Sequence, residues 1–69
     1  MIDERIDFSG KTAIITGGAS GMGELASREM AERGAAVVLA DIDLERAEAV
    51  AAEIRAAGGR ALAAKTATT

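Results

Sequence analysis

The fold is decided by the stretch KTAIITGGASGMG, residues 11–23, in which a short β-branched run leads directly into four glycines within seven residues. Residues 11–16 predict a strand that is buried on both faces, as strands of parallel sheets usually are. Residues 21–33 predict a helix, because apolar residues recur there at helical spacing. These apolar residues share one face of the helix: Met22, Leu25, Ala26 and Met30. A glycine-rich turn between a strand and a helix is the setting that a phosphate-binding loop requires.

The alternation of strands and helices continues along the rest of the chain. Residues 36–41, AVVLAD, predict a second apolar strand, and residues 60–66 predict a weaker third one. Between them, a helix is expected to start after its N-cap candidate Asp43 and to end at Gly58. The apolar stripe expected on this helix consists of Leu44, Ala47, Ala51 and Ile54.

These elements predict an α/β fold. Short connections between apolar strands, in the order strand, helix, strand, helix, strand, predict a βαβαβ unit with a parallel three-stranded sheet. Right-handed crossovers give its strands the order 3-2-1. We expect one partial nucleotide-binding domain over residues 1–69, with a polar lead-in at residues 1–7 that Phe8 anchors and the βαβαβ unit at residues 8–69.

The composition excludes several classes of protein. The 69 residues include no Cys and no His, so we expect no disulfide framework and no metal site built on these ligands. The net charge of −3 argues against nucleic-acid binding. The apolar runs are only a few residues long, and the acidic N-terminal residues do not resemble a signal peptide. We therefore expect a cytoplasmic protein that contacts no membrane.

The glycines of the turn follow the spacing G-x-x-x-G-x-G, at Gly17, Gly21 and Gly23. Backbone N–H groups at a helix N-terminus attract an anion, and side chains would keep a pyrophosphate away from them. We expect Gly17 to allow the turn out of the strand, Gly21 to admit the ligand, and Gly23 to let the helix pack closely on the sheet. The alternative is a glycine-rich turn selected for packing alone, which does not account for the acid that ends the second strand.

That acid is Asp41, which lies 18 residues after Gly23. A carboxylate at this position accepts hydrogen bonds from the ribose hydroxyls of an adenosine and repels a 2′-phosphate, so it favours NAD over NADP. Ile42 is expected to line one side of the adenine pocket. The alternative role of Asp41 is that of a loop or helix-cap acid, although Asp43 is better placed as the cap.

Three segments resemble the classical short-chain dehydrogenase/reductase family. Residues 8–23 are similar to the opening of the family's N-terminal NAD-binding segment, which is part of a Rossmann doubly wound fold. Residues 37–41 are similar to its second strand with the NAD-selecting acid, and residues 58–61 to the entry of its third strand. The residues and this resemblance together predict an NAD(H) site formed by Gly17, Ser20, Gly21, Met22, Gly23, Asp41 and Ile42.

The resemblance covers only the first part of such an enzyme. Family members are about 250 residues long and transfer a hydride between NAD and an alcohol or carbonyl compound, using a Ser-Tyr-Lys catalytic set. This chain contains no Tyr, and Ala67 takes the place of the family's Asp that contacts the adenine amino group. We therefore expect no catalytic residues and no catalysis from these 69 residues alone. We expect association either with the remainder of a larger enzyme or with further copies of the chain.

Two other functions stay open at this point. One is a non-catalytic βαβαβ module that binds a nucleotide weakly or not at all and self-associates through its open sheet. The other is a complete nucleotide-binding protein that uses another ligand, such as S-adenosylmethionine, which the G-x-x-x-G-x-G spacing does not favour. The mass of the intact protein distinguishes a segment of a larger enzyme from a complete small module.

Overall fold

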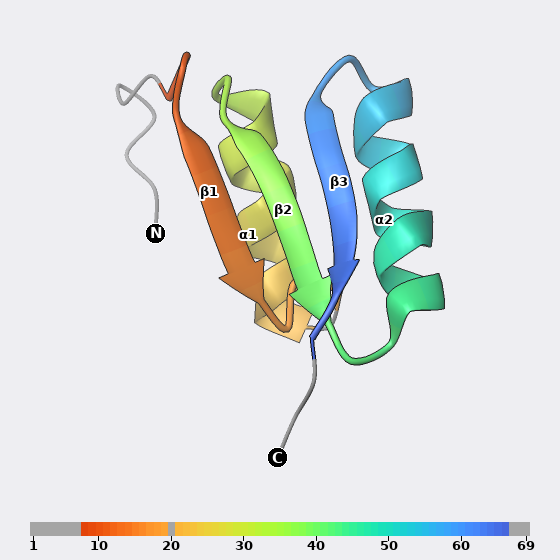
Figure 1. The fold of residues 1–69 in the computed structure, drawn as a ribbon. Coiled ribbons are helices and arrows are strands. Elements are labelled where there is room, and N and C mark those ends of the chain that lie inside the picture. Colours follow the sequence, from red (N-terminus) through yellow and green to blue (C-terminus); the bar gives the residue numbers. More distant parts are fainter. Residues whose placement is uncertain (1–7, 20, 67–69) are drawn as a thin grey trace.

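The computed structural model describes residues 8–19 and 21–66. Two helices and three strands alternate along them (Figure 1), and this order confirms the predicted βαβαβ unit. The elements are β1 (Thr12–Thr16), α1 (Gly21–Glu32), β2 (Ala36–Asp41), α2 (Leu44–Ala56) and β3 (Arg60–Lys65). The predicted lead-in and Ala67 lie outside the described residues, and the extent of the domain stays a prediction. Across the described part of the chain, neither helix is long and apolar enough to span a bilayer.

The sheet is parallel and its strands have the order β1-β2-β3, which is the predicted order 3-2-1 read from the other edge. The register pairs Ile14 with Val38 and Val38 with Leu62, so these three side chains share one face of the sheet. Next to β1, the N–H of Phe8 donates to the carbonyl oxygen of Arg33 at 2.8 Å. Phe8 is half-buried and packs against the core.

The core lies between the sheet and its two helices, which cover the same face. Leu39 and Val37 of β2 have almost no exposed surface and pack against small side chains of both helices. Figure 1 shows α1 behind β1 and β2, and α2 alongside β3. The buried residues of α2 are Ala47, Val50, Ala51 and Ile54, which includes most of the predicted stripe. The N-cap is Asp43, whose Oδ1 accepts a hydrogen bond from the N–H of Arg46 at 3.1 Å.

The prediction that residues 11–16 are buried on both faces is wrong. Exposed and half-buried residues alternate along β1, and 72% of the surface of Ile14 is exposed. Leu62 is exposed on the same face of β3. The reason is topological, because two right-handed crossovers that advance in the same direction put both helices on one face of a sheet. The described residues therefore leave the opposite face uncovered.

The predicted apolar face of α1 is also corrected. Its buried residues are Ser27 and Ala31, whereas 83% of the surface of Met22 is exposed. Leu25 is exposed as well, and Met30 is half-buried at the edge of the core. Small side chains face the sheet because α1 lies close to it, and the hydroxyl of Ser27 donates to the carbonyl oxygen of Gly23 at 2.7 Å.

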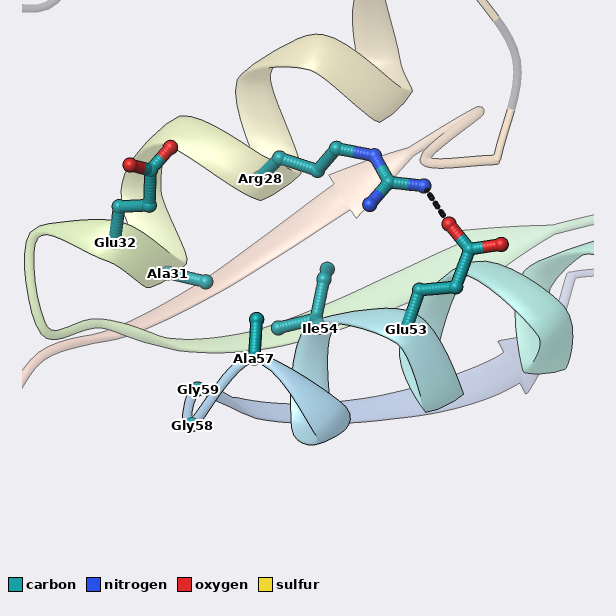
Figure 2. A pocket seen from close by; sticks show the side chains of 8 residues that line it. All are labelled: Arg28, Ala31, Glu32, Glu53, Ile54, Ala57, Gly58 and Gly59. Atoms are coloured by element: carbon teal, nitrogen blue, oxygen red, sulfur yellow. Dashed lines mark hydrogen bonds and ion pairs between the residues drawn. The ribbon is translucent and has the colours of Figure 1, made fainter.

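A hollow of about 350 Å³ lies between the C-terminal halves of the two helices. Figure 2 shows Arg28 of α1 reaching across it to Glu53 of α2. Arg28 also pairs with Glu24 at 2.9 Å, and the i,i+4 spacing of these two residues on one helix favours this ion pair. The hollow ends at Gly58 and Gly59, which precede β3, so it lies at the opposite end of the sheet from the glycine turn.

Candidate functional site

The glycine turn and Asp41 meet at one edge of the sheet, where the parallel strands have their carboxyl ends. The N–H of Gly17 donates to the carbonyl oxygen of Ala40 at 2.7 Å, which folds the turn over the end of β2. Ligands of open parallel α/β sheets bind outside this edge. The candidate site is therefore formed by the turn after β1, the first turn of α1 and the residues that end β2.

The backbone of the turn leaves room for a ligand at the start of α1. Gly17 and Gly21 have φ angles of 68° and 51°, in the left-handed region that favours glycine. Apart from its chain neighbours and its own helix backbone, a Cβ at Gly21 would meet no atom within 4 Å, so open space adjoins the first helical residue. The first N–H groups of a helix lack intrahelical acceptors and carry a partial positive charge. A pyrophosphate fits this arrangement both sterically and electrostatically.

Two further glycines allow the turn to lie close to its neighbours. A Cβ at Gly23 would overlap the carbonyl group of Gly17, whose carbon would be 2.8 Å away. Gly23 therefore lets α1 pack closely against the turn, and its expected role in packing the helix on the sheet stays a prediction. Gly18 lies close to the sheet, because a Cβ added to it would be 3.0 Å from the Cα of Leu39. Gly18 is not among the predicted site residues, and its only signal in the sequence is that it follows another glycine.

Asp41 is 93% covered, since only 7% of its surface is exposed. Its Oδ1 accepts a hydrogen bond from the N–H of Asp43 at 3.0 Å, and its Oδ2 accepts one from the N–H of Ala19 at 3.2 Å. These two N–H groups, that of Asp43 foremost, lower the pKa of Asp41. The carboxylate thus stays charged at neutral pH and fastens the turn to β2. A carboxylate oxygen has two lone pairs, so the group can accept hydrogen bonds from hydroxyls beside those from the backbone.

The remaining predicted site residues lie around this edge. Ile42 is exposed directly after Asp41, and Met22 is exposed in the first turn of α1. Both apolar side chains are thus available to a ligand, although no contact of theirs assigns them a role. Ser20 lies outside the described residues, and the part played by each of the seven predicted residues stays a prediction.

In the part of the chain that the structure describes, no three side chains of the metal-binding types come together as a group. The hydroxyl of Ser27 is fully buried and bonded to its own helix, so it serves the structure of α1. The geometry of the site is that of a binding site for an anionic ligand with an adjacent hydroxyl-bearing part.

Comparison with known sequences assigns the part of the chain that contains the candidate site to a family. Residues 11–69 match the sequence model of a family described as short chain dehydrogenase. The chain is 56% identical over 55 residues to 2,5-dichloro-2,5-cyclohexadiene-1,4-diol dehydrogenase from Sphingobium indicum, covering 80% of the chain and 22% of that protein. It is 47% identical over 58 residues to cyclohexanol dehydrogenase from Acinetobacter sp., covering 84% and 23%. The chain therefore spans less than a quarter of the length of these relatives.

Solved structures contain the same arrangement of elements. A hydroxysteroid dehydrogenase from Escherichia coli matches with a TM-score of 0.85 and 39% identity, over 88% of this chain and 26% of that one. A protein described as an NAD(P)-dependent gluconate 5-dehydrogenase from Beutenbergia cavernae, with NADP bound at low occupancy, matches with a TM-score of 0.84 and 33% identity. That match covers 88% of this chain and 24% of the other.

Proposed function

The chain belongs to the short-chain dehydrogenase family, and we propose that its glycine turn and the end of β2 bind the adenosine and pyrophosphate parts of a nicotinamide dinucleotide. The observation that carries the proposal is the open space at Gly21, directly beside the helix N-terminus and on the same edge as the charged Asp41. The pyrophosphate would lie at the first turn of α1, and the adenosine ribose at Asp41. Ile42 would line the adenine.

Within this proposal, the preferred dinucleotide is NAD(H). The pKa of Asp41 is lowered, so its carboxylate carries a full negative charge at neutral pH. A 2′-phosphate next to this charge would be repelled, whereas a ribose hydroxyl would donate a hydrogen bond to it. The bound NADP of the gluconate 5-dehydrogenase neighbour makes this preference a point for experiment.

The activity of the whole protein is a separate part of the proposal. The relatives named above are dehydrogenases, and the chain spans less than a quarter of them. We propose hydride transfer between NAD and an alcohol or carbonyl compound as the reaction, because the nicotinamide supplies the hydride chemistry when it is bound. The 69 residues contain no Tyr and no His, so this segment would bind and orient the cofactor, and catalytic groups would come from elsewhere. A cytoplasmic location stays part of the same expectation.

The binding proposal is tested by titrating NADH and NADPH into the chain and following saturation-transfer NMR. Half of a dinucleotide site should bind only in the millimolar range, which corresponds to about −4 kcal/mol. NADH should bind more tightly than NADPH, and Asp41→Arg should reverse the order. Glu45→Arg makes the same change of charge at an exposed position of α2 and should leave the order unchanged. A parent chain that prefers NADPH would contradict the role given to Asp41.

A second candidate function is self-association, which the exposed apolar side chains favour. Ile14 lies on the uncovered face of β1, and Met22 and Leu25 are exposed on the adjacent helix. Among the described residues, β1 pairs with β2 alone, and an apolar strand with an unpaired edge is a template for pairing with another chain. In this case the chain would form homo-oligomers through β1 and α1 and bind a nucleotide weakly or not at all.

A further inference from the structure

Four hydrogen bonds form a closed ring between the glycine turn, the end of β2 and the start of α2. The N–H of Ala19 donates to Asp41, and the N–H of Asp43 donates to the other oxygen of the same carboxylate. The carboxylate of Asp43 accepts from the N–H of Arg46 at 3.1 Å. The Nε of Arg46 then donates to the carbonyl oxygen of Ala19 at 2.6 Å and closes the ring.

Ala19 is the point at which the ring holds the turn. The residue has no exposed surface, and both its N–H and its C=O are engaged, the first by Asp41 and the second by Arg46. Two successive peptide groups of the turn are thereby fixed in orientation. A buried carbonyl that lost its donor would be left unsatisfied, which proteins generally avoid.

The position of Arg46 in α2 is not explained by the helix itself. Arg46 is the third residue of α2, where the partial positive charge of the helix N-terminus disfavours a cation. Its side chain is exposed, so burial of its stem adds little. The bond to Ala19, 27 residues away, and the attraction of the Asp41 carboxylate both favour an arginine here.

We propose that Arg46 is a positioning residue of the nucleotide site, which holds the glycine turn and the Asp41 carboxylate in the arrangement that receives the dinucleotide. The inference rests on the proposed function, because the ring of hydrogen bonds is argued to prepare the turn for the dinucleotide proposed to bind there. It assigns no contact between Arg46 and the cofactor. Its consequence is that the turn is organised before binding, so that the ligand does not bear the cost of ordering it.

The test uses three variants of the chain. Arg46→Met removes the donor and the charge, and Arg46→Lys keeps a charge and a single donor nitrogen. Arg60→Met is the matched control, because Arg60 donates to the carbonyl oxygen of Gly34 at 2.9 Å, at the far end of the sheet from Asp41. Hydrogen exchange at the Ala19 amide is measured by mass spectrometry with fragmentation. This measurement can be made on monomeric and on self-associated chains. Binding of NADH, NADPH and ADP-ribose is titrated in parallel.

Arg46→Met should speed exchange at Ala19 about tenfold and weaken NADH and ADP-ribose by a similar factor, the loss expected for one hydrogen bond to a charged group. Arg46→Lys should fall between the parent and Arg46→Met in both measurements. Arg60→Met should match the parent in both, although it loses the same type of bond. A residue that contributes only to overall stability would not change both the exchange at Ala19 and the affinity for NADH and ADP-ribose in parallel.

Three results would overturn the inference. Unchanged exchange at Ala19 in Arg46→Met would mean that Arg46 does not hold the turn. Faster exchange at Ala19 in Arg46→Met with unchanged affinity for NADH and ADP-ribose would mean that fixing the turn does not contribute to ligand binding. A loss confined to NADPH would mean that Arg46 contacts a 2′-phosphate directly. Failure of the parent to bind any of the three ligands would refute the proposed function instead, and exchange at Ala19 would still decide whether Arg46 fixes the turn.

Discussion

Replacing Gly23 by Ala sets two physical effects of opposite sign against each other. Gly23 is the third residue of α1, and Ala in a helix is favoured over Gly by about 1 kcal/mol. Helix propensity alone thus predicts a more stable protein. The packing of the turn predicts the reverse, because the new methyl group would overlap the carbonyl group of Gly17.

The size of the packing effect follows from the contacts of the added methyl group. Its carbon would lie 2.8 Å from the carbonyl carbon of Gly17 and 3.1 Å from the Cα of Gly18. Ordinary contact begins near 3.4 Å, so the turn and the helix must separate by at least 0.6 Å. The obstructing atoms are backbone, and the bond from Gly17 to Ala40 ties them to β2. We therefore expect the overlap to cost about 3 kcal/mol, the upper end for overpacking. After the gain of about 1 kcal/mol in helix propensity, the net destabilisation is about 2 kcal/mol.

Urea unfolding followed by far-UV circular dichroism measures the change, with NADH titration alongside. Gly23→Ala should lower the free energy of unfolding by about 2 kcal/mol and abolish binding, because the displaced turn no longer presents its N–H groups. The control is Gly58→Ala, at φ 96° with nothing within 4 Å of the new methyl group. It should cost about 1–2 kcal/mol of backbone strain and leave binding unchanged. A Gly23→Ala chain as stable as the parent would refute the packing argument.

Two further predictions concern acid stability and association. The folded pKa of Asp41 lies below its unfolded value of about 3.9, so its contribution to stability is present above pH 4 or so and is lost as the pH falls through the folded pKa. Thermal melts between pH 6 and pH 2 should therefore show a smaller acid loss for Asp41→Asn than for the parent, and equal losses would contradict this. Ile14→Lys should shift an associated chain towards monomer in sedimentation equilibrium, whereas Leu62→Lys, on the same face but on β3, should not. A parent chain that is a folded monomer at high micromolar concentration would count against self-association.

The elements and their order were predictable because they depend on neighbouring residues. Apolar runs bounded by glycines predict strands, and Asp43 followed by an apolar stripe predicts a helix with its N-cap, as the structure confirms. The edge that carries the candidate site followed from the same reasoning, because parallel strands have their carboxyl ends on one side. The positions of Gly17, Gly21 and Asp41 were therefore predictable, although what each residue binds stays a prediction.

What only the tertiary structure decided is how far each surface is covered and which distant groups meet. The periodicity of α1 pointed to Met22 and Leu25 as its inner face, but the close approach of helix and sheet turned Ser27 and Ala31 inward. The bond between Arg46 and Ala19 joins residues 27 positions apart. Local sequence records the preference of each segment for helix or strand. The angle and distance at which segments pack depend on side chains from all of them at once, so the contacts of the candidate site arise only in the folded chain.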